Sequence, residues 1–334
     1  MAEYWNWAKT FCCRPHLYAE PTSIDSLRTL INDINKTKSK VRVIGCAHSP
    51  SALSMSNEVL ISMKNFNKII EIDEKNLEIH CQSGVLLSTL NEILPQHNLS
   101  LPVQGSISTL TIAGVVSTAT HGSGIKYGTL SSYVRSITLM KLNGEIKEYC
   151  LEDDEDLFRC VTCCLVRYIN NIYVKLDGIS NHKIDRCDKL FNFDCLFYQY
   201  ANEWAIPLDQ AVSCLVQLEK LMENNINVHF PIEIRFSKEE LSYLSPAYKR
   251  QTCWINTVAY RPFGKTHLEH RSFFDAFETI CYKHNGRPHW AKEHPLNNKH
   301  FSELYPNWNL FHEKRKQFDP NDLFINDCLR NVFS

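Results

Sequence analysis

The stretch VRVIGCAHSP, residues 41–50, decides how the chain is interpreted. Val41, Val43 and Ile44 are β-branched and apolar, which is typical of a short strand buried on both faces. Gly45 ends the strand, and small residues and a histidine follow. Such a turn lets backbone N–H groups approach a phosphate, and the histidine could then touch the same ligand. Taken alone, the stretch favours a plain βα turn with an incidental histidine, because the G-x-G-x-x-G pattern is incomplete.

A second stretch, GSISTLTIAGVVSTATHGSG at residues 105–124, changes this balance. It is rich in small and hydroxyl-bearing residues and carries no Asp, Glu, Lys or Arg. Such a run rarely forms a core, but it can lie flat along an extended ligand and offer hydroxyl and N–H groups. Together the two stretches resemble the flavin-contacting segments of FAD-binding domains of the vanillyl-alcohol-oxidase type. In that family the histidine of the first turn often carries the flavin covalently through its 8α-methyl group.

Composition sets outer bounds on the function. The chain has 334 residues, 44% of them hydrophobic, which is enough to bury a sizeable core. Its net charge of -1 gives no electrostatic case for a nucleic-acid partner. No Rossmann glycine fingerprint followed by a ribose-binding acid is present, which argues against a nicotinamide dehydrogenase. The 14 cysteines are irregularly spaced, and we interpret most of them as reduced, half-buried thiols.

Apolar periodicity predicts mixed helices and strands in the first half of the chain. An amphipathic helix is expected at residues 21–34, with Thr22 or Ser23 as its cap. The expected strands are residues 41–44, 59–63, 69–73 and 77–81, and a hairpin spans 134–149 around Asn143-Gly144. There are more strands here than a doubly wound nucleotide fold needs.

Further landmarks, in the right order, resemble the aldonolactone oxidases. They are residues 6–10, 45–50, 120–128, 203–207, 231–236, 260–264, 286–292 and 318–326. The resemblance implies an α+β fold: a PCMH-type FAD-binding domain of two α/β subdomains followed by a truncated α+β cap. We expect the FAD-binding domain at residues 1–156, a poorly matched junction at 157–200 and the substrate domain at 201–334. The last segment is expected to pack back on the FAD-binding domain.

The motif PIEIRF at residues 231–236 is the first candidate for the substrate site. Strand alternation places Glu233 and Arg235 on the same face, where a carboxylate and a guanidinium can bind a polyol or lactone. An arbitrary E-x-R on a strand is more often a routine surface ion pair, but the family resemblance favours a substrate site.

The motif RPHWAKEH at residues 287–294 is the second candidate. Lys292 could stabilise an enolate or oxyanion or lower the pKa of a substrate hydroxyl. For His289 a functional role and a place in a polar loop remain equally open. Spacing suggests no third ligand for His289 and His294, so we expect no metal site.

The resemblance assigns Glu233, Arg235 and Lys292 to substrate polarisation and His48 to a covalent FAD link. The expected cofactor-binding residues are Gly45, Cys46, Ala47, His48, Ser49, Ser106, Gly114, Thr118, His121, Gly122 and Ser123. The implied reaction oxidises an aldono-1,4-lactone of the L-gulono type at C2 by hydride transfer to flavin N5. Dioxygen is the implied acceptor, giving hydrogen peroxide, and the product leads to ascorbate.

The chain departs from the family in two places. Cys46 and Ala47 stand where the family has glycines, which weakens the turn if either needs a positive φ. Beyond residue 160 the chain reaches Glu203 almost directly, so part of the last flavin-domain strand pair and much of the cap are expected to be missing. That gap removes the segment held responsible for membrane association, although the family implies the endoplasmic reticulum membrane; the chain shows no signal peptide or transmembrane run. A non-catalytic or unstable remnant therefore remains the alternative.

Overall fold

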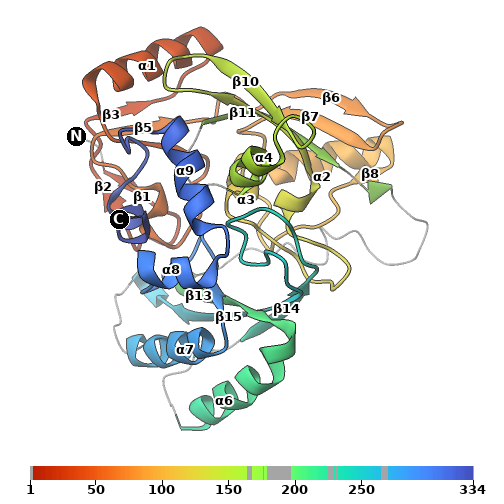
Figure 1. Ribbon diagram of the computed structural model, residues 1–334, viewed down its shortest axis with the longest axis vertical. Helices are drawn as coiled ribbons and strands as arrows, with labels where there is room; N and C mark the ends of the chain where they lie inside the picture. Colours follow the sequence, from red (N-terminus) through yellow and green to blue (C-terminus); the bar gives the residue numbers. More distant parts are fainter. Residues whose placement is uncertain are drawn as a thin grey trace.

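The computed structural model describes residues 3–163, 168–175, 177–178, 197–224, 229, 232–264 and 270–333. Within them the chain forms an α+β fold with two parts (Figure 1). The first part holds a three-stranded and a five-stranded sheet, and the second holds a four-stranded sheet backed by helices. This confirms the fold class expected from the sequence.

The three-stranded sheet contains the stretch that opens the sequence analysis. Strand β4 (Val41–Ile44) and β3 (Leu17–Ala19) both run parallel to the central β5 (Val59–Ser62). The expected helix is α1 (Ile24–Thr37), capped by Ser23 in a capping box with Ser26. Its apolar stripe is buried in the same core as Val41 of β4 and Val59 and Ile61 of β5, so the helix packs against the sheet that leads into the histidine turn.

The five-stranded sheet includes part of the shortened junction. Strands β6 (Ile69–Asp73) and β7 (Glu78–Gln82) pair antiparallel, as do β9 (Val134–Met140) and β10 (Ile146–Cys150). Strand β11 (Tyr168–Lys175) lies between β7 and β9 and pairs with both. The missing part of the strand pair that is expected from the sequence therefore leaves no gap between β7 and β9, because the junction itself supplies the central strand.

The four-stranded sheet has the order β14-β15-β13-β16. Its long central strands β13 (Gln199–Pro207) and β15 (Thr252–Tyr260) pair antiparallel along their whole length. Strand β14 (Glu233–Ser237) pairs with β15, and β16 (Arg287–Pro288) pairs with β13. Helices α6 (Ala211–Glu223) and α7 (Arg271–Lys283) lie on the side of the sheet away from the first part (Figure 1). The other face of this sheet therefore lies toward the first part of the molecule and can line a site between the two parts.

Shorter elements connect and close these layers. They are β1 (Tyr4–Trp5), β2 (Cys12–Cys13), η1 (Ala52–Ser54), α2 (Leu87–Ile93), η2 (Leu94–His97), β8 (Leu99–Ser100), α3 (Ile112–Ser117), η3 (Leu130–Tyr133), α4 (Glu155–Thr162), β12 (Asp177–Gly178), η4 (Leu208–Gln210), η5 (Pro262–Gly264), α8 (Asn298–Leu304), α9 (Trp308–Phe318) and α10 (Asp327–Phe333).

The end of the chain returns to the first sheet. The Val41 N–H donates to the Leu323 carbonyl at 2.8 Å, and the buried Arg42 guanidinium donates to the Phe324 carbonyl at 2.9 Å. The Asn326 amide donates to three carbonyls around η1. These contacts join the last residues of the chain to the strand that carries the histidine turn.

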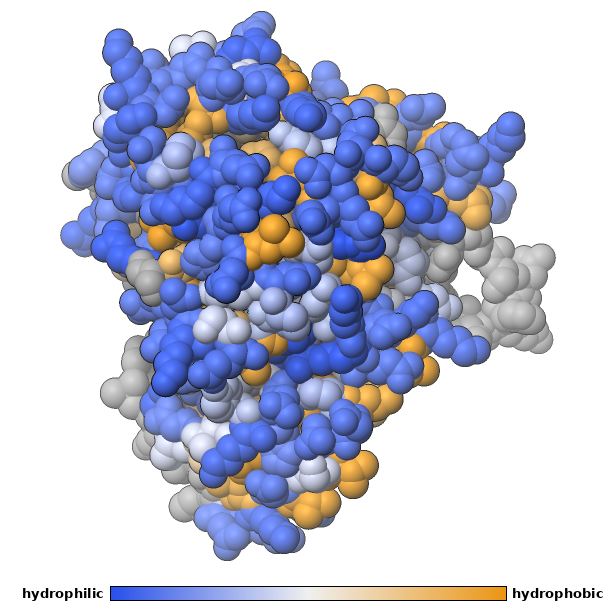
Figure 2. All heavy atoms as spheres, in the orientation of Figure 1, coloured by the Kyte–Doolittle hydropathy of each residue, from blue (hydrophilic) through white to orange (hydrophobic). Residues whose placement is uncertain are grey.

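Apolar side chains reach the surface along the lower margin of the molecule, over α6 and β14 (Figure 2). They include Val212 and Val216 of α6 and Ile234 and Phe236 of β14. The last two alternate with Glu233 and Arg235, as the strand period requires. Among the residues that the structure describes, no helix is long and apolar enough to cross a membrane.

Candidate active site

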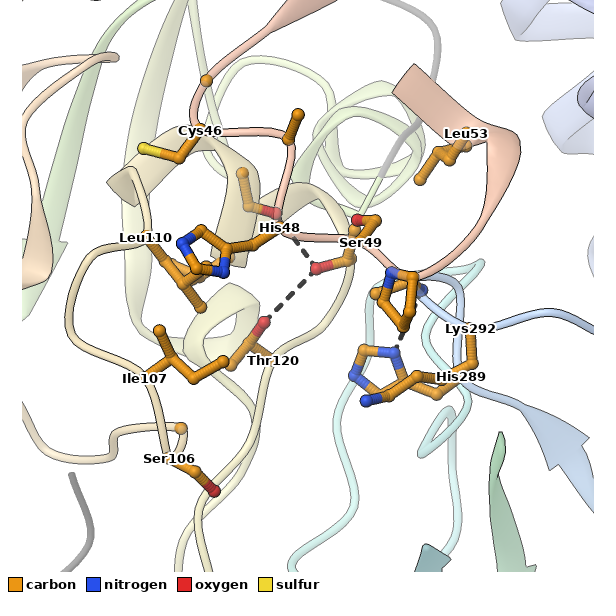
Figure 3. A pocket seen from close by; sticks show the side chains of 18 of the residues that line it. Cys46, His48, Ser49, Leu53, Ser106, Ile107, Leu110, Thr120, His289 and Lys292 are labelled. Carbon is orange, nitrogen blue, oxygen red and sulfur yellow. Dashed lines mark hydrogen bonds between the residues drawn. The ribbon is translucent and has the colours of Figure 1, made fainter. Parts of the chain in front are cut away.

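A cavity of about 980 Å³ lies between the two parts of the molecule. One side is built from the turn after β4 and the segment around α3. The other side is built from β13, β14, β15 and the loop after β16. Figure 3 shows His48 and Ser106 from the first side and His289 and Lys292 from the second around the same space. The cavity is large enough for an extended cofactor with a small substrate beside it.

The cavity lining includes most of the predicted residues. From the first part these are Gly45, Cys46, Ala47, His48, Ser49, Ser106, Gly114, Thr118 and His121, and from the second part Glu233, Arg235 and Lys292. Gly122 and Ser123 lie outside the lining. Ser123 is exposed, and the Gly122 carbonyl accepts a hydrogen bond from His121.

The two segments of the first side pack closely through a glycine. A β-carbon at Gly45 would lie 2.1 Å from Oγ1 of Thr111, the residue that caps α3. Ala47 has φ 48°, so one of the two non-glycine residues of the turn does adopt the left-handed conformation that glycine favours. The turn is therefore formed, at a cost of about 1–2 kcal/mol for the β-carbon of Ala47.

The ring of His48 is held on one edge only. Its Nε2 lies 3.1 Å from Oγ1 of Thr109, and the Trp7 ring stacks on it at 5.6 Å. Its Nδ1 is buried and has no hydrogen-bond partner among the described residues. Burial lowers the pKa of His48, so the ring is neutral near pH 7 and Nδ1 can carry a free lone pair.

These features fit a bound FAD. Hydroxyl groups of Ser54 and Ser83, which line the cavity, are also buried without partners in the part of the chain that the structure describes. A lining of small residues with unpartnered polar atoms is what an extended polar cofactor would complete. Gly45, His48 and the segment around α3 would hold it.

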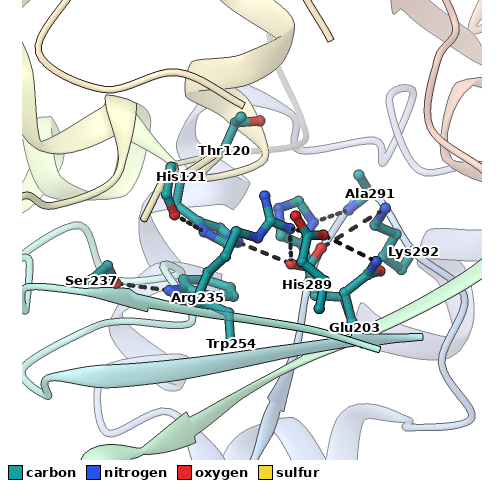
Figure 4. A network of polar contacts seen from close by, with 12 residues as sticks. Thr120, His121, Glu203, Arg235, Ser237, Trp254, His289, Ala291 and Lys292 are labelled. Carbon is teal, nitrogen blue, oxygen red and sulfur yellow. Dashed lines mark hydrogen bonds and ion pairs between the residues drawn. The ribbon is translucent and has the colours of Figure 1, made fainter. Parts of the chain in front are cut away.

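The second side is a charged network centred on Glu203 (Figure 4). Its Oε1 accepts a hydrogen bond from Nη2 of Arg235 at 2.5 Å and lies 3.2 Å from Nε2 of His121. Its Oε2 lies 3.8 Å from Nζ of Lys292. Burial alone would raise the pKa of Glu203, but Arg235 and His121 overcome that effect and hold it well below its usual range. Glu203 is therefore an anion with only 2% of its surface exposed.

Strand register explains why these groups converge. Asn256 on β15 faces Glu203 on β13 and Glu233 on β14, so the three polar side chains form a row across the sheet. Arg235 lies opposite Trp254 in the next such row. The expected pairing of Glu233 with Arg235 is present at 3.4 Å, but the shorter contact of Arg235 is to Glu203.

The loop after β16 brings His289 and Lys292 to the same row. The His289 N–H donates to the Glu203 carbonyl at 2.9 Å, and the Ala291 N–H donates to Nδ1 of His289 at 3.1 Å. Burial lowers the pKa of His289 to about 3, so this ring is neutral over the physiological range. His289 thus lines the cavity as an uncharged hydrogen-bonding group.

Glu203, Trp254 and Asn256 were not predicted as site residues. Glu203 appears in the sequence only as part of a landmark, although a lone charge within the uncharged run ANEWAIP at residues 201–207 was a usable signal. Trp254 and Asn256 become visible only through strand register. Unpartnered buried atoms, Nε of Arg235 and Oδ1 of Asn256, also face this side in the described residues.

The ligand atoms of His121, Glu203 and His289 lie within 4.8 Å of one another, a spacing that a metal ion could bridge. Glu203 thus supplies a third potential ligand that sequence spacing did not suggest. The arrangement nevertheless opposes a cation, because Arg235 already occupies Oε1 and the Lys292 ammonium lies beside Oε2.

Comparison with known proteins agrees with this geometry. Residues 15–149 match an FAD binding domain model, and residues 154–332 match the D-arabinono-1,4-lactone oxidase model. An L-gulonolactone oxidase from Scyliorhinus torazame is 28% identical over 99% of this chain and 98% of its own length. An L-gulono-1,4-lactone dehydrogenase from Mycobacterium tuberculosis is 25% identical over 99% of each chain. The first alignment spans 432 positions, so that relative carries segments with no counterpart in this chain.

A crystal structure of cholesterol oxidase from B. sterolicum superposes with a TM-score of 0.79 at 12% identity, covering 99% of this chain and 96% of that one. This likeness shows the vanillyl-alcohol-oxidase-type fold. The family model covers more than half of the chain and includes Glu203, Arg235 and Lys292 of the charged side of the cavity. The chain therefore belongs to the D-arabinono-1,4-lactone oxidase family of FAD-dependent aldonolactone oxidoreductases.

Proposed function

We propose that the protein oxidises an aldono-1,4-lactone of the L-gulono type at C2, with dioxygen as the final electron acceptor and hydrogen peroxide as the second product. The proposal rests on one shared cavity in which Glu233, Arg235 and Lys292 line one side and the two small-residue segments line the other. When bound, FAD supplies the hydride acceptor, while the protein orients and polarises the lactone.

The charged side of the cavity suits a lactone with several hydroxyl groups. Among the described residues, Nε of Arg235 and Oδ1 of Asn256 have no hydrogen-bond partner. One donor and one acceptor are therefore free to bind a polar ligand. Glu233 is 34% exposed in its side chain and can accept from a substrate hydroxyl. The Lys292 ammonium would favour loss of the C2 hydroxyl proton, because it stabilises the oxygen as negative charge develops.

His48 is our proposed attachment point for FAD, through Nδ1 and the 8α carbon of the flavin. The support is the geometry of the ring: Thr109 holds Nε2, Trp7 holds the ring face, and Nδ1 is left free in the cavity wall. A neutral imidazole nitrogen is the nucleophilic form that such a bond requires. The bond would replace one C–H bond of the 8α-methyl group, and the two electrons released would pass through the flavin to dioxygen, which becomes hydrogen peroxide.

Two alternatives to this proposal exist. In the first the protein uses an electron acceptor other than dioxygen, and in the second it has no catalytic activity. The relative named as a dehydrogenase supports an acceptor other than dioxygen. A non-catalytic remnant is less well supported, because β11 keeps the flavin-side sheet continuous and the charged network is complete. Location at the endoplasmic reticulum membrane remains a prediction from the resemblance.

The first test is the absorption spectrum of the purified protein before and after acid precipitation. We expect flavin absorbance in the pellet of the unaltered protein, and in the supernatant for His48→Ala. His97→Ala is the matched control, because His97 is a surface histidine paired with Glu74 far from the turn in sequence.

Anaerobic addition of L-gulono-1,4-lactone should then bleach the flavin, and admission of air should restore its colour with release of peroxide. A protein that binds no flavin when riboflavin is ample would overturn the proposal. A flavin that the lactone reduces but air does not reoxidise would favour the dehydrogenase alternative.

A further inference from the structure

The ring of His121 is buried between two hydrogen-bond acceptors. Its Nδ1 lies 2.9 Å from the carbonyl oxygen of Gly122, and its Nε2 lies 3.2 Å from Oε1 of Glu203. The exposed fraction is 2% for both His121 and Glu203, so bulk water cannot mediate either contact. A neutral imidazole has one N–H and one lone pair and would aim that lone pair at an acceptor. Only a ring with two N–H groups, or a carboxyl that carries the proton, satisfies both contacts.

We infer that His121 and Glu203 share one proton in addition to the N–H of a neutral imidazole, and that the ring carries most of it. We further infer that Glu203 is the positioning residue of the substrate site. The ring carries the proton because Arg235 donates to the same Oε1 at 2.5 Å and keeps the carboxylate ionised. Trp254 stacks on His121 with ring centroids 3.7 Å apart, an arrangement that favours a cationic ring.

The groups that face His121 act in opposite directions. Burial and the Arg235 guanidinium lower the pKa of His121, and Glu203 and the Gly122 carbonyl, which raise it, offset only part of this effect. The net direction of the pKa shift is therefore downward, and the proton is assigned from the geometry of the two acceptors. His289 and Lys292 approach the pair from the loop after β16, and neither offers a further negative charge. The proton is therefore held by the two acceptors against an unfavourable field, and removal of the Glu203 charge should release it.

Glu203 contacts a positively charged side chain from each of three other segments of the site. Its carboxylate contacts Arg235 of β14, His121 of the second flavin-side segment and Lys292 of the last loop. With Glu233 included, three positive and two negative charges leave the network with one net positive charge. That charge would stabilise an oxygen of the lactone as it becomes negative. This catalytic consequence depends on the proposed function, but the proton on His121 does not.

The proton can be counted directly in the flavin-containing protein. Histidine labelled with nitrogen-15 reports whether each ring nitrogen carries hydrogen, and a chelator in the buffer removes any metal. We expect both nitrogens of His121 to be protonated between about pH 6 and pH 8, where an ordinary histidine loses its charge. A His121 with one protonated and one bare nitrogen in this range would overturn the inference, whatever the activity.

The variant Glu203→Gln tests the positioning role. We expect His121 to lose its second proton, and kcat for the lactone to fall by about 100-fold with an unchanged flavin content. Glu240→Gln is the matched control, because Glu240 is equally buried but is held by the hydroxyls of Thr129, Ser242 and Ser245 outside the cavity.

An unchanged kcat in Glu203→Gln would overturn the positioning role. Should that variant fail to fold, Glu203→Asp keeps the charge and shortens its reach, and a kcat equal to that of the unaltered protein would count against the inference in the same way. A doubly protonated His121 in a protein that no lactone reduces would support the proton assignment and refute only the proposed function.

Discussion

The two sides of the cavity are built on different principles. The flavin-facing side relies on main-chain shape: a glycine that admits Thr111, an alanine at φ 48° and a run of small side chains. The substrate-facing side relies on side-chain charge, with Glu203, Arg235 and Lys292 converging from separate elements. The first side should tolerate loss of charge but respond to changes in backbone geometry, and the second should behave in the opposite way. Four experiments test that contrast.

Removal of Arg235 should have the largest effect. Arg235→Ala leaves Glu203 buried without its nearest cation, so we expect kcat/KM to fall by about 10³-fold, the scale of a lost buried charge partner. Arg235→Lys should recover part of the activity, because it restores the charge but not the planar fork. Steady-state kinetics and flavin content are the measurements. Loss of flavin from Arg235→Ala would show that the two sides are not independent.

Mild acid should destabilise the protein through two buried histidines of the loop after β16. Burial lowers the pKa of His289 to about 3 and that of His294 to about 4, whereas both rings titrate near 6.5 once unfolded. The unfolded state therefore binds more protons as the pH falls below 6.5, and stability decreases with it. From about pH 7 to pH 5 the loss is about 2 kcal/mol for each ring. Urea unfolding at both pH values measures it, and His294→Asn should show a shallower pH dependence than the unaltered protein.

Replacement of Glu233 by glutamine should have a moderate effect. Its side chain is 34% exposed and lies 3.4 Å from Arg235, so water screens the pair and Glu203 remains to hold the guanidinium. We expect kcat/KM to fall by about tenfold, mainly through KM. A loss as large as that of Arg235→Ala would mean that Glu233 itself takes the substrate proton.

Relief of the left-handed alanine should have the smallest effect. Ala47→Gly removes the β-carbon at φ 48° and should stabilise the protein by about 0.5–1 kcal/mol, with equal or better flavin loading. Ala276→Gly, inside α7 and outside the cavity, is the control of opposite sign and should destabilise by about 0.5–1 kcal/mol. Thermal unfolding with and without added FAD compares them. Reduced flavin content in Ala47→Gly would mean that the β-carbon itself contacts the cofactor.

The contrast also explains what could be predicted from the sequence. The flavin-facing side is local: residues 41–50 and 105–124 each carry their own pattern of strand, turn and small residues, so two short runs were enough to show the resemblance to FAD-binding domains. Alternation likewise placed Glu233 and Arg235 on one face correctly. Glu203, at the centre of the charged side, contacts residues that are distant in sequence. It lies near Arg235 and His121 only because of the strand register and the packing of the two parts. The central place of β11 escaped prediction for the same reason, since a junction with no recognisable motif gives no hint of its pairing partners.

The position of β11 has a consequence for how the chain is assembled during synthesis. A chain that stops at residue 156, the expected end of the FAD-binding domain, would lack the strand between β7 and β9 and hold two separate hairpins instead of one sheet. The contacts of the three-stranded sheet are completed later still during synthesis, because some of its hydrogen bonds are made with Leu323, Phe324 and Asn326. Contacts so distant in sequence form slowly. The part that is synthesised first is thus completed last, and its unfinished strands must stay free of aggregation until the final residues arrive.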